Sequence, residues 1–190
     1  NFTRYVALNF MYFHIPFITT MNNYPIATIL GGGGFIGRYL VRNLAKKNYR
    51  CIISSRTPFQ KGYLKTQAPP GAVEIINWDT KDLSKLKEGI NNSDIVINLL
   101  GILYESKNQK FSKIHSDIPE IISNLCSKAK VKKFIHVSAI GANEQSRSLY
   151  QQSKFKGEQK ALHNFKDTII IRPSVVCGTE DNFTNLFSKL

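Results

Sequence analysis

The chain has 190 residues, of which 42% are hydrophobic and 21% charged, so its length and composition are those of one globular domain with a sizeable core. No apolar run reaches about 20 residues, so the sequence predicts no membrane span. The net charge of +13 makes nucleic acid a candidate partner. The lysines form no long block, however, and no recognition motif accompanies them, so we expect no nucleic acid. No Asp or Glu precedes Glu74, which favours an anionic ligand in the first part of the chain.

The cysteines and histidines indicate neither a disulfide framework nor a metal site. Cys51, Cys126 and Cys177 lie far apart and form no C-x-x-C pair, which fits a reducing compartment. The histidines show no metal-ligand spacing, and we interpret all of them as surface or packed residues: His14, His115, His136 and His163.

The first residues differ from the rest of the chain. We divide it into an N-terminal extension, 1–22, and a domain, 23–190. The extension is aromatic-rich and holds Arg4 but no acid. It fits either a targeting segment, although the pattern of a transit peptide is weak, or in-frame sequence upstream of a start at Met21. The second interpretation is preferred because the recognisable domain begins just after it.

Apolar runs alternate with helical patterns along the domain. Short continuous apolar runs predict buried strands at 26–30, 50–55, 72–78, 93–101, 133–139 and 167–176. Helices are predicted at 35–48, 80–90, 111–130 and 148–165, with Pro119 as the start or a kink of the third. This alternation implies an α/β fold with a doubly wound parallel sheet, the Rossmann fold. Its ligand crevice lies at the carboxyl ends of the strands.

Four consecutive glycines stand between the first strand and the first helix, in "ATILGGGGFIGRYL". Gly31, Gly34 and Gly37 have the spacing G-x-x-G-x-x-G, which suits a sharp turn, close approach of a pyrophosphate, and close packing of helix on strand. The amides that open the helix, at Phe35 and Ile36, then face phosphate oxygens. The strand–loop–helix context favours dinucleotide binding over a merely tight turn.

The end of the second strand indicates which dinucleotide is bound. NAD-binding proteins usually place an acid there, but this chain has Ser54, Ser55 and Arg56. A hydroxyl and a guanidinium suit a 2′-phosphate, so the sequence favours NADP(H) over NAD(H). The alternative is that Arg56 is a solvated loop residue. Asp79, after the third strand, is either an acceptor for the adenine amino group or the N-cap of the next helix.

Tyr150 and Lys154 lie four residues apart on one face of the predicted helix 148–165. An ammonium beside a phenol favours the phenolate and lowers its pKa, which would equip the tyrosine for interconversion of an alcohol and a ketone. The spacing alone is weak evidence, because many helices carry such a pair. Its position after the fifth strand, at the cofactor end of the sheet, strengthens the hypothesis.

Taken together, the glycine motif, "NLLG", "HVSAIGA", Y-x-x-x-K and "RPSVVCG" resemble the extended and atypical short-chain dehydrogenase/reductases. More narrowly, "GGGGFIGRYLVRNLAKKNYR", "NLLGILYE", "SLYQQSKFKGE" and "IIIRPSVVCGTEDNFTNLF" resemble the NAD(P)H-binding accessory subunit of respiratory complex I and its bacterial relatives. The resemblance runs from about Ile26 to Leu190. Members of that family continue beyond this point, so we expect the domain to be truncated at its C-terminal end.

The resemblance implies specific roles for several residues. Tyr150 and Lys154 match the catalytic pair of the superfamily, and the third member is a hydroxyl just past the fifth strand. Ser138 is available, but the usual register places that hydroxyl at Ala139, which puts turnover in doubt and leaves binding intact. The resemblance also places four residues at the nicotinamide end of the cofactor: Leu100, Gly101, Pro173 and Ser174.

Two functions follow from the resemblance. The first is an NADP(H)-binding subunit or assembly factor of a respiratory complex, in which the cofactor stabilises the fold. The alternative is an active NAD(P)-dependent reductase, epimerase or dehydratase acting on a nucleotide-sugar or similar substrate. Either role implies a dinucleotide ligand, and the first adds complex I subunits as partners. The expected location is the bacterial cytoplasm or the matrix side of the mitochondrial inner membrane.

Overall fold

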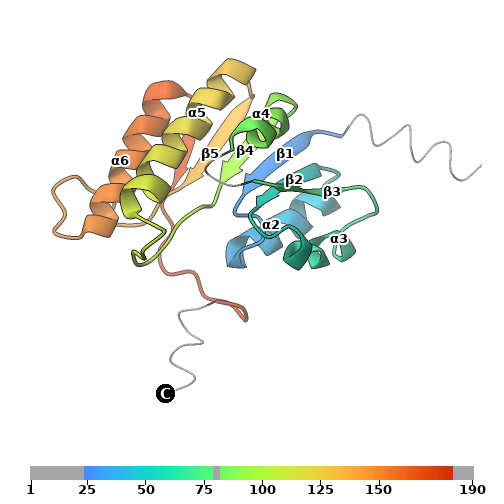
Figure 1. Ribbon diagram of the computed structural model, residues 1–190, viewed down its shortest axis with the longest axis horizontal. Coiled ribbons are helices and arrows are strands. Elements are labelled where there is room, and N and C mark those ends of the chain that lie inside the picture. The colour runs from blue at the N-terminus through green and yellow to red at the C-terminus, as the bar shows by residue number, and fades with distance from the viewer. Residues whose placement is uncertain (1–23, 79–81, 182–190) are drawn as a thin grey trace, which may run out of the picture.

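A parallel β-sheet forms the centre of the molecule (Figure 1). The computed structural model describes residues 24–78 and 82–181. Within them, six strands pair in the order β3-β2-β1-β4-β5-β6, and every pair is parallel. The doubly wound sheet predicted from the sequence is therefore confirmed. The strands are β1 (Ile26–Leu30), β2 (Arg50–Ser55), β3 (Val73–Asn77), β4 (Ile95–Asn98), β5 (Lys133–Val137) and β6 (Thr168–Ile171).

Helices cover both faces of the sheet. They lie in the connections between consecutive strands of the chain. The helical elements are α2 (Phe35–Lys46), the 3₁₀ turn η1 (Phe59–Lys61), α3 (Tyr63–Thr66), α4 (Ser84–Asn91), the π-helical segment η2 (Ser112–Asp117), α5 (Ile118–Ala129) and α6 (Leu149–Asn164). Helices α4, α5 and α6 lie together on one face, as Figure 1 shows.

Consecutive residues of β1 belong to two separate cores, one on each face of the sheet. Ile29 packs in one cluster with Val41 of α2 and Leu64 of α3. Leu30 packs in the other cluster, which includes Ile122 of α5. Because the side chains of a strand alternate between faces, burial on both sides requires a continuous apolar run. This is why the strands of this chain lack polar alternation.

The predicted elements are all present within the described residues, but their boundaries differ. Strand β4 is shorter than 93–101: before it, the Asp94 carboxylate accepts from the Ile26 amide at 2.8 Å, and after it, the Leu100 amide donates to the Asn98 side chain. The predicted helix 111–130 begins as the π-helical η2 and becomes α-helical at Ile118, next to Pro119. The short helices η1 and α3 were not predicted, because 59–66 shows no helical periodicity of apolar residues.

The carboxyl ends of β1 and β4 meet at the point where the strand order reverses. Gly31, directly after β1, has a φ of +82°, and a Cβ on it would lie 3.2 Å from the backbone of Leu99, directly after β4. Strand β2 lies on the other side of β1. The chain thus leaves β1 and β4 in different directions, which opens a crevice at their carboxyl ends.

Close packing of α6 on η2 generates a prediction about stability. A Cβ on Gly157 of α6 would lie 1.8 Å from the backbone carbonyl oxygen of His115 in η2. Because a backbone carbonyl cannot rotate away, Gly157→Ala must separate the two elements. We expect it to lower the free energy of unfolding by about 2 kcal/mol or more, despite the better helix propensity of Ala. Urea denaturation measures this change.

Gly62→Ala is the matched control. Gly62 has a helical φ of −52°, and a Cβ there would lie 3.4 Å from its nearest neighbour, the carbonyl oxygen of Phe59. This variant should be neutral or slightly stabilising. Equal unfolding midpoints for the two variants would contradict the packing argument.

Candidate functional site

The glycine run forms a tight loop between β1 and α2. The Gly34 amide donates to the Gly31 carbonyl oxygen at 3.0 Å, which closes the turn. A Cβ on Gly37 would lie 2.4 Å from that same oxygen, so only glycine allows α2 to pack this closely on the loop. Two of the three predicted roles, the sharp turn and the close helix packing, are therefore visible in the backbone.

The start of α2 is suited to an anion. Gly34 is its N-cap residue and is exposed, with φ −82° and ψ −176°. Within the described residues, no side chain caps this helix and its first turn holds no acid. The opening amides, including those of Phe35 and Ile36, are thus left for a ligand oxygen. Since a side chain at Gly34 would occupy the space before these amides, the loop fits a dinucleotide pyrophosphate.

Arg56 reaches from the end of β2 toward the loop that follows β4. Its guanidinium lies against the side-chain amide of Gln109. With the amide oxygen turned toward Arg56, the Nη1–oxygen and Nη2–oxygen distances are 2.9 and 3.2 Å. Ser55 accepts from the Thr57 amide at 3.1 Å, which holds the turn after β2. The pair Arg56–Gln109 therefore spans the crevice, since β1 separates β2 from β4.

Lys154 lies buried at the opposite end of the crevice. Its ammonium donates to the carbonyl oxygen of Val137 at 3.3 Å, and its Nζ lies 3.1 Å from where a Cβ of Gly101 would stand. Burial lowers the pKa of Lys154 to about 8, and the charge of Glu158, one turn along α6, acts in the opposite direction. Glu158 itself is buried and accepts from Nε and Nη2 of Arg172 at 2.9 and 2.5 Å.

The expected lowering of the Tyr150 pKa is wrong. Burial instead raises the pKa of Tyr150. The ring packs edge-on against His115 and Phe111, with centroids 5.3 and 5.8 Å apart. The Lys154 ammonium donates to the carbonyl oxygen of Val137. Burial of the phenol is therefore what sets the direction of the Tyr150 pKa.

His115 is a structural residue of this end of the site that the sequence interpretation left as merely packed. It is fully buried and joins the loop after β4 to α6. The Ile102 amide donates to His115 Nε2 at 3.0 Å, which leaves Nδ1 to donate to Ser153 Oγ at 2.9 Å. Ser153 in turn donates to the Tyr150 carbonyl oxygen at 2.7 Å. Burial, assisted by the Lys154 charge, lowers the pKa of His115 to about 3, so the ring is neutral.

Ser138 follows β5 directly and is buried. Its amide donates to the Ile171 carbonyl oxygen at 2.8 Å, while its Oγ has no hydrogen-bond partner among the described residues. Alternation along β5 gives Ser138 the same face as Phe134, which packs with the helices α5 and α6. The catalytic role of Ser138 stays a prediction.

The other predicted site residues lie at the same edge of the sheet or outside the described chain. The Leu100 amide donates to the side-chain oxygen of Asn98 at 3.1 Å, and the Pro173 carbonyl oxygen accepts from the Ile140 amide at 2.9 Å. Ser174 is exposed. The second contact joins the loops after β5 and β6, whereas the first is local to the end of β4. Asp79 lies outside the described residues, so both of its interpretations stay open.

Within residues 24–78 and 82–181, no three His, Cys, Asp or Glu side chains gather as metal ligands would. No helix there is long and apolar enough to cross a bilayer.

Comparison with known proteins identifies the family. Residues 27–189 match the model of the NAD dependent epimerase/dehydratase family. The chain belongs to this family. The resemblance inferred from the motifs is thereby confirmed at the level of the superfamily, and the glycine loop and the Tyr150–Lys154 pair occupy the matched region.

Several family relatives are respiratory subunits. The mitochondrial "NADH dehydrogenase [ubiquinone] 1 alpha subcomplex subunit 9" of Mus musculus is 35% identical over 165 residues, covering 86% of this chain and 44% of the relative. The mitochondrial "NADH-ubiquinone oxidoreductase 40 kDa subunit" of Neurospora crassa is 35% identical, with the same shares covered. A ceramide reductase of Caulobacter vibrioides is 26% identical, covering 84% of this chain and 49% of the relative. The chain spans less than half the length of these family relatives.

Solved structures of other proteins share the fold. UDP-glucuronic acid 4-epimerase from Bacillus cereus, in complex with NAD, superposes with a TM-score of 0.65 at 23% identity, covering 80% of this chain and 58% of the epimerase. Vestitone reductase from alfalfa superposes with a TM-score of 0.61 at 18% identity, covering 77% and 56%. At these identities, the likeness shows the fold alone.

The burial of Lys154 predicts a pH-dependent cost in stability. The folded-state pKa of about 8 lies below the ordinary 10.5, so below pH 8 the folded protein carries a poorly solvated charge. This penalty falls as the pH rises from 8 to 10.5, where the folded state loses the proton before the unfolded state does. We expect Lys154→Met to raise the melting temperature of the ligand-free protein at pH 7, and the gain to shrink toward pH 10.5.

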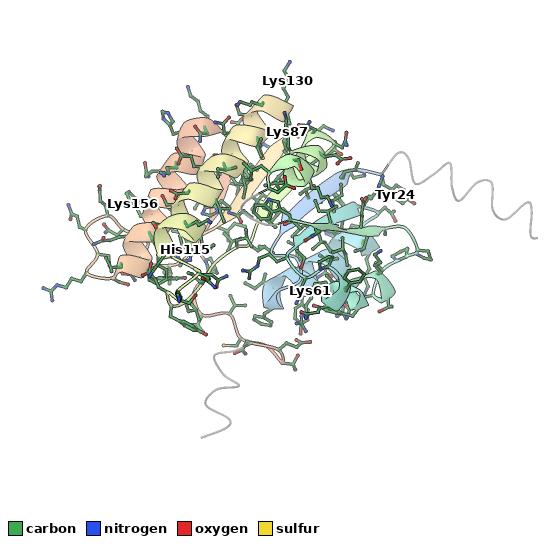
Figure 2. The ribbon with its side chains drawn as sticks, viewed as in Figure 1. Tyr24, Lys61, Lys87, His115, Lys130 and Lys156 are labelled. Atoms are coloured by element: carbon green, nitrogen blue, oxygen red, sulfur yellow. The ribbon has the colours of Figure 1, made fainter. Side chains whose placement is uncertain are left out.

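Lys156→Met is the control for this prediction, because Lys156 is exposed on the same helix (Figure 2). Its effect should be small and constant over this pH range. A melting temperature lowered by Lys154→Met at pH 7 would contradict the assigned penalty.

Proposed function

We propose that this protein binds NADP(H) as an accessory subunit of mitochondrial respiratory complex I, on the matrix side of the inner membrane. The bound cofactor stabilises the fold and prepares it for assembly. The observation that carries the proposal is the uncapped start of α2 behind the Gly31–Gly37 loop, in a chain 35% identical to complex I subunits. The bacterial cytoplasm receives less support, because these relatives are mitochondrial.

The preference for NADP(H) rests on the end of β2. Arg56 is exposed there beside Ser55, and the neutral Gln109 is the group that faces its guanidinium. An Asp or Glu in this position would bind the ribose hydroxyls of NAD and repel a 2′-phosphate. A guanidinium instead binds a phosphate through paired N–H donors.

A supporting role fits the other end of the crevice better than oxidation of an alcohol does. Burial holds the Tyr150 phenol protonated, and the Ser138 hydroxyl is buried. Both features leave the tyrosine able to donate a proton but poorly prepared to accept one at neutral pH. A second candidate, reduction of a carbonyl compound, is favoured by the retained Tyr150–Lys154 spacing and by the ceramide reductase relative.

The first test is the identity of the retained ligand. The purified protein is denatured, and the released small molecules are separated and identified by mass spectrometry. We expect NADP⁺ or NADPH in near-stoichiometric amount. Release of NAD(H) alone would overturn the cofactor assignment, and release of no dinucleotide from a folded sample would overturn the proposal.

Gly34→Asp separates the binding role of the loop from its structural role. The extended backbone of Gly34 suits an N-cap aspartate, whose carboxylate would accept from the first amides of α2. It would also repel a pyrophosphate. The cofactor-free variant should therefore melt at or above the wild-type temperature, while NADPH at a hundred times the wild-type Kd should stabilise only the wild type, by about 5–10 °C.

Tyr150→Phe distinguishes the two candidate functions. If the protein supports assembly, this variant should keep wild-type NADPH affinity and wild-type incorporation into complex I, measured by native gel electrophoresis. Loss of a reductase activity with unchanged NADPH affinity would favour the second candidate and contradict a purely supporting role.

A further inference from the structure

Lys61 lies directly on the glycine loop. A Cβ on Gly33 would stand 2.7 Å from Cδ, 2.9 Å from Cε and 3.0 Å from Cγ of Lys61, so the methylene stem of the lysine covers the backbone of this glycine. Gly33 is accordingly buried, whereas the next residue, Gly34, is exposed. The lysine therefore contacts the loop that we assign to the cofactor, although it comes from the segment after β2.

The segment that carries Lys61 is anchored to the same loop. The Lys61 amide donates to the Pro58 carbonyl oxygen at 3.0 Å within η1. Two residues after Lys61, the Tyr63 hydroxyl donates to the Gly33 carbonyl oxygen at 3.2 Å. The following Leu64 is fully buried. These contacts fix the base of the Lys61 side chain, so its ammonium extends from a defined position near the crevice.

The charge around this position is unbalanced. Within the described residues, no carboxylate lies within ion-pair distance of Lys61 or of Arg56, which stands five residues earlier in the same segment. Figure 2 places Lys61 at the same end of the molecule as His115, opposite Lys130. One cation without a described acidic partner therefore lies on the glycine loop, and a second follows β2, the strand that pairs with β1.

We propose that Lys61 is a specificity residue for NADP(H), supplying the second positive charge that binds the 2′-phosphate with Arg56. This inference rests on the proposed NADP(H) binding. A phosphomonoester carries up to two negative charges, which a single exposed guanidinium balances incompletely. Arg56 can engage the phosphate through paired donors, and the Lys61 ammonium acts as a compact charge beside it.

The test compares Lys61→Met with the wild-type protein by titration calorimetry with NADPH, NADH, 2′,5′-ADP and 5′-AMP. Methionine keeps an unbranched stem that can still cover Gly33, so the fold should persist. We expect the Kd for NADPH and 2′,5′-ADP to rise about tenfold or more, since a charged hydrogen bond is lost. The Kd for NADH and 5′-AMP should change by less than about threefold, because these ligands lack the 2′-phosphate.

Lys65→Met is the matched control, because Lys65 is exposed in the neighbouring helix α3. It should leave every Kd unchanged. An unchanged NADPH affinity in Lys61→Met, or an equal loss for NADPH and NADH, would overturn the assignment of Lys61 while wild-type NADPH binding still supports the proposed function. A wild-type protein that binds neither coenzyme would overturn the proposed function itself.

Discussion

The structure depends on the contact between the first helix and the loop before it. Helix α2 starts with amides that no described side chain caps, and Gly37 packs against the Gly31 carbonyl oxygen at a distance that excludes a Cβ. The close contact sets the direction of the helix, and the uncapped amides give its start a partial positive charge. An anion at this point would complete hydrogen bonds that the protein alone leaves open. The close helix contact and the open amides explain why a segment so rich in glycine lies in the centre of the domain.

The other end of the crevice is organised by buried polar groups. His115 joins the loop after β4 to α6 through Ile102 and Ser153, and the Glu158–Arg172 pair joins α6 to the end of β6. Lys154 lies between these two contacts, where burial disfavours its charge. Such an arrangement costs stability and holds one ammonium in one place. A loss of stability from a buried charge is expected at a ligand-binding site rather than in a packed core.

The fold was predictable because its signals are local. A strand buried on both faces appears in the sequence as a short apolar run. The glycine motif is complete within seven residues, Gly31 to Gly37. The direction of the Tyr150 pKa shift was not predictable from the sequence. It depends on Phe111 and His115, which contact the ring from another part of the chain. The spacing of Tyr150 and Lys154 along one helix indicated an ammonium near the phenol. It did not indicate the rings that bury the phenol and raise its pKa. The same holds for Lys61, whose contact with Gly33 joins two loops and leaves no periodic pattern.

The central claim is that the amides opening α2 bind a pyrophosphate. Backbone ¹⁵N NMR tests it directly, by following the amide resonances of the loop and the helix start while NADPH, and separately NADH, is added to the cofactor-free protein. Both coenzymes should cause the largest shifts at Gly34, Phe35 and Ile36, because both contain the pyrophosphate. If these amides stay unperturbed while the protein remains folded, or if shifts arise only elsewhere, the account of this site is wrong.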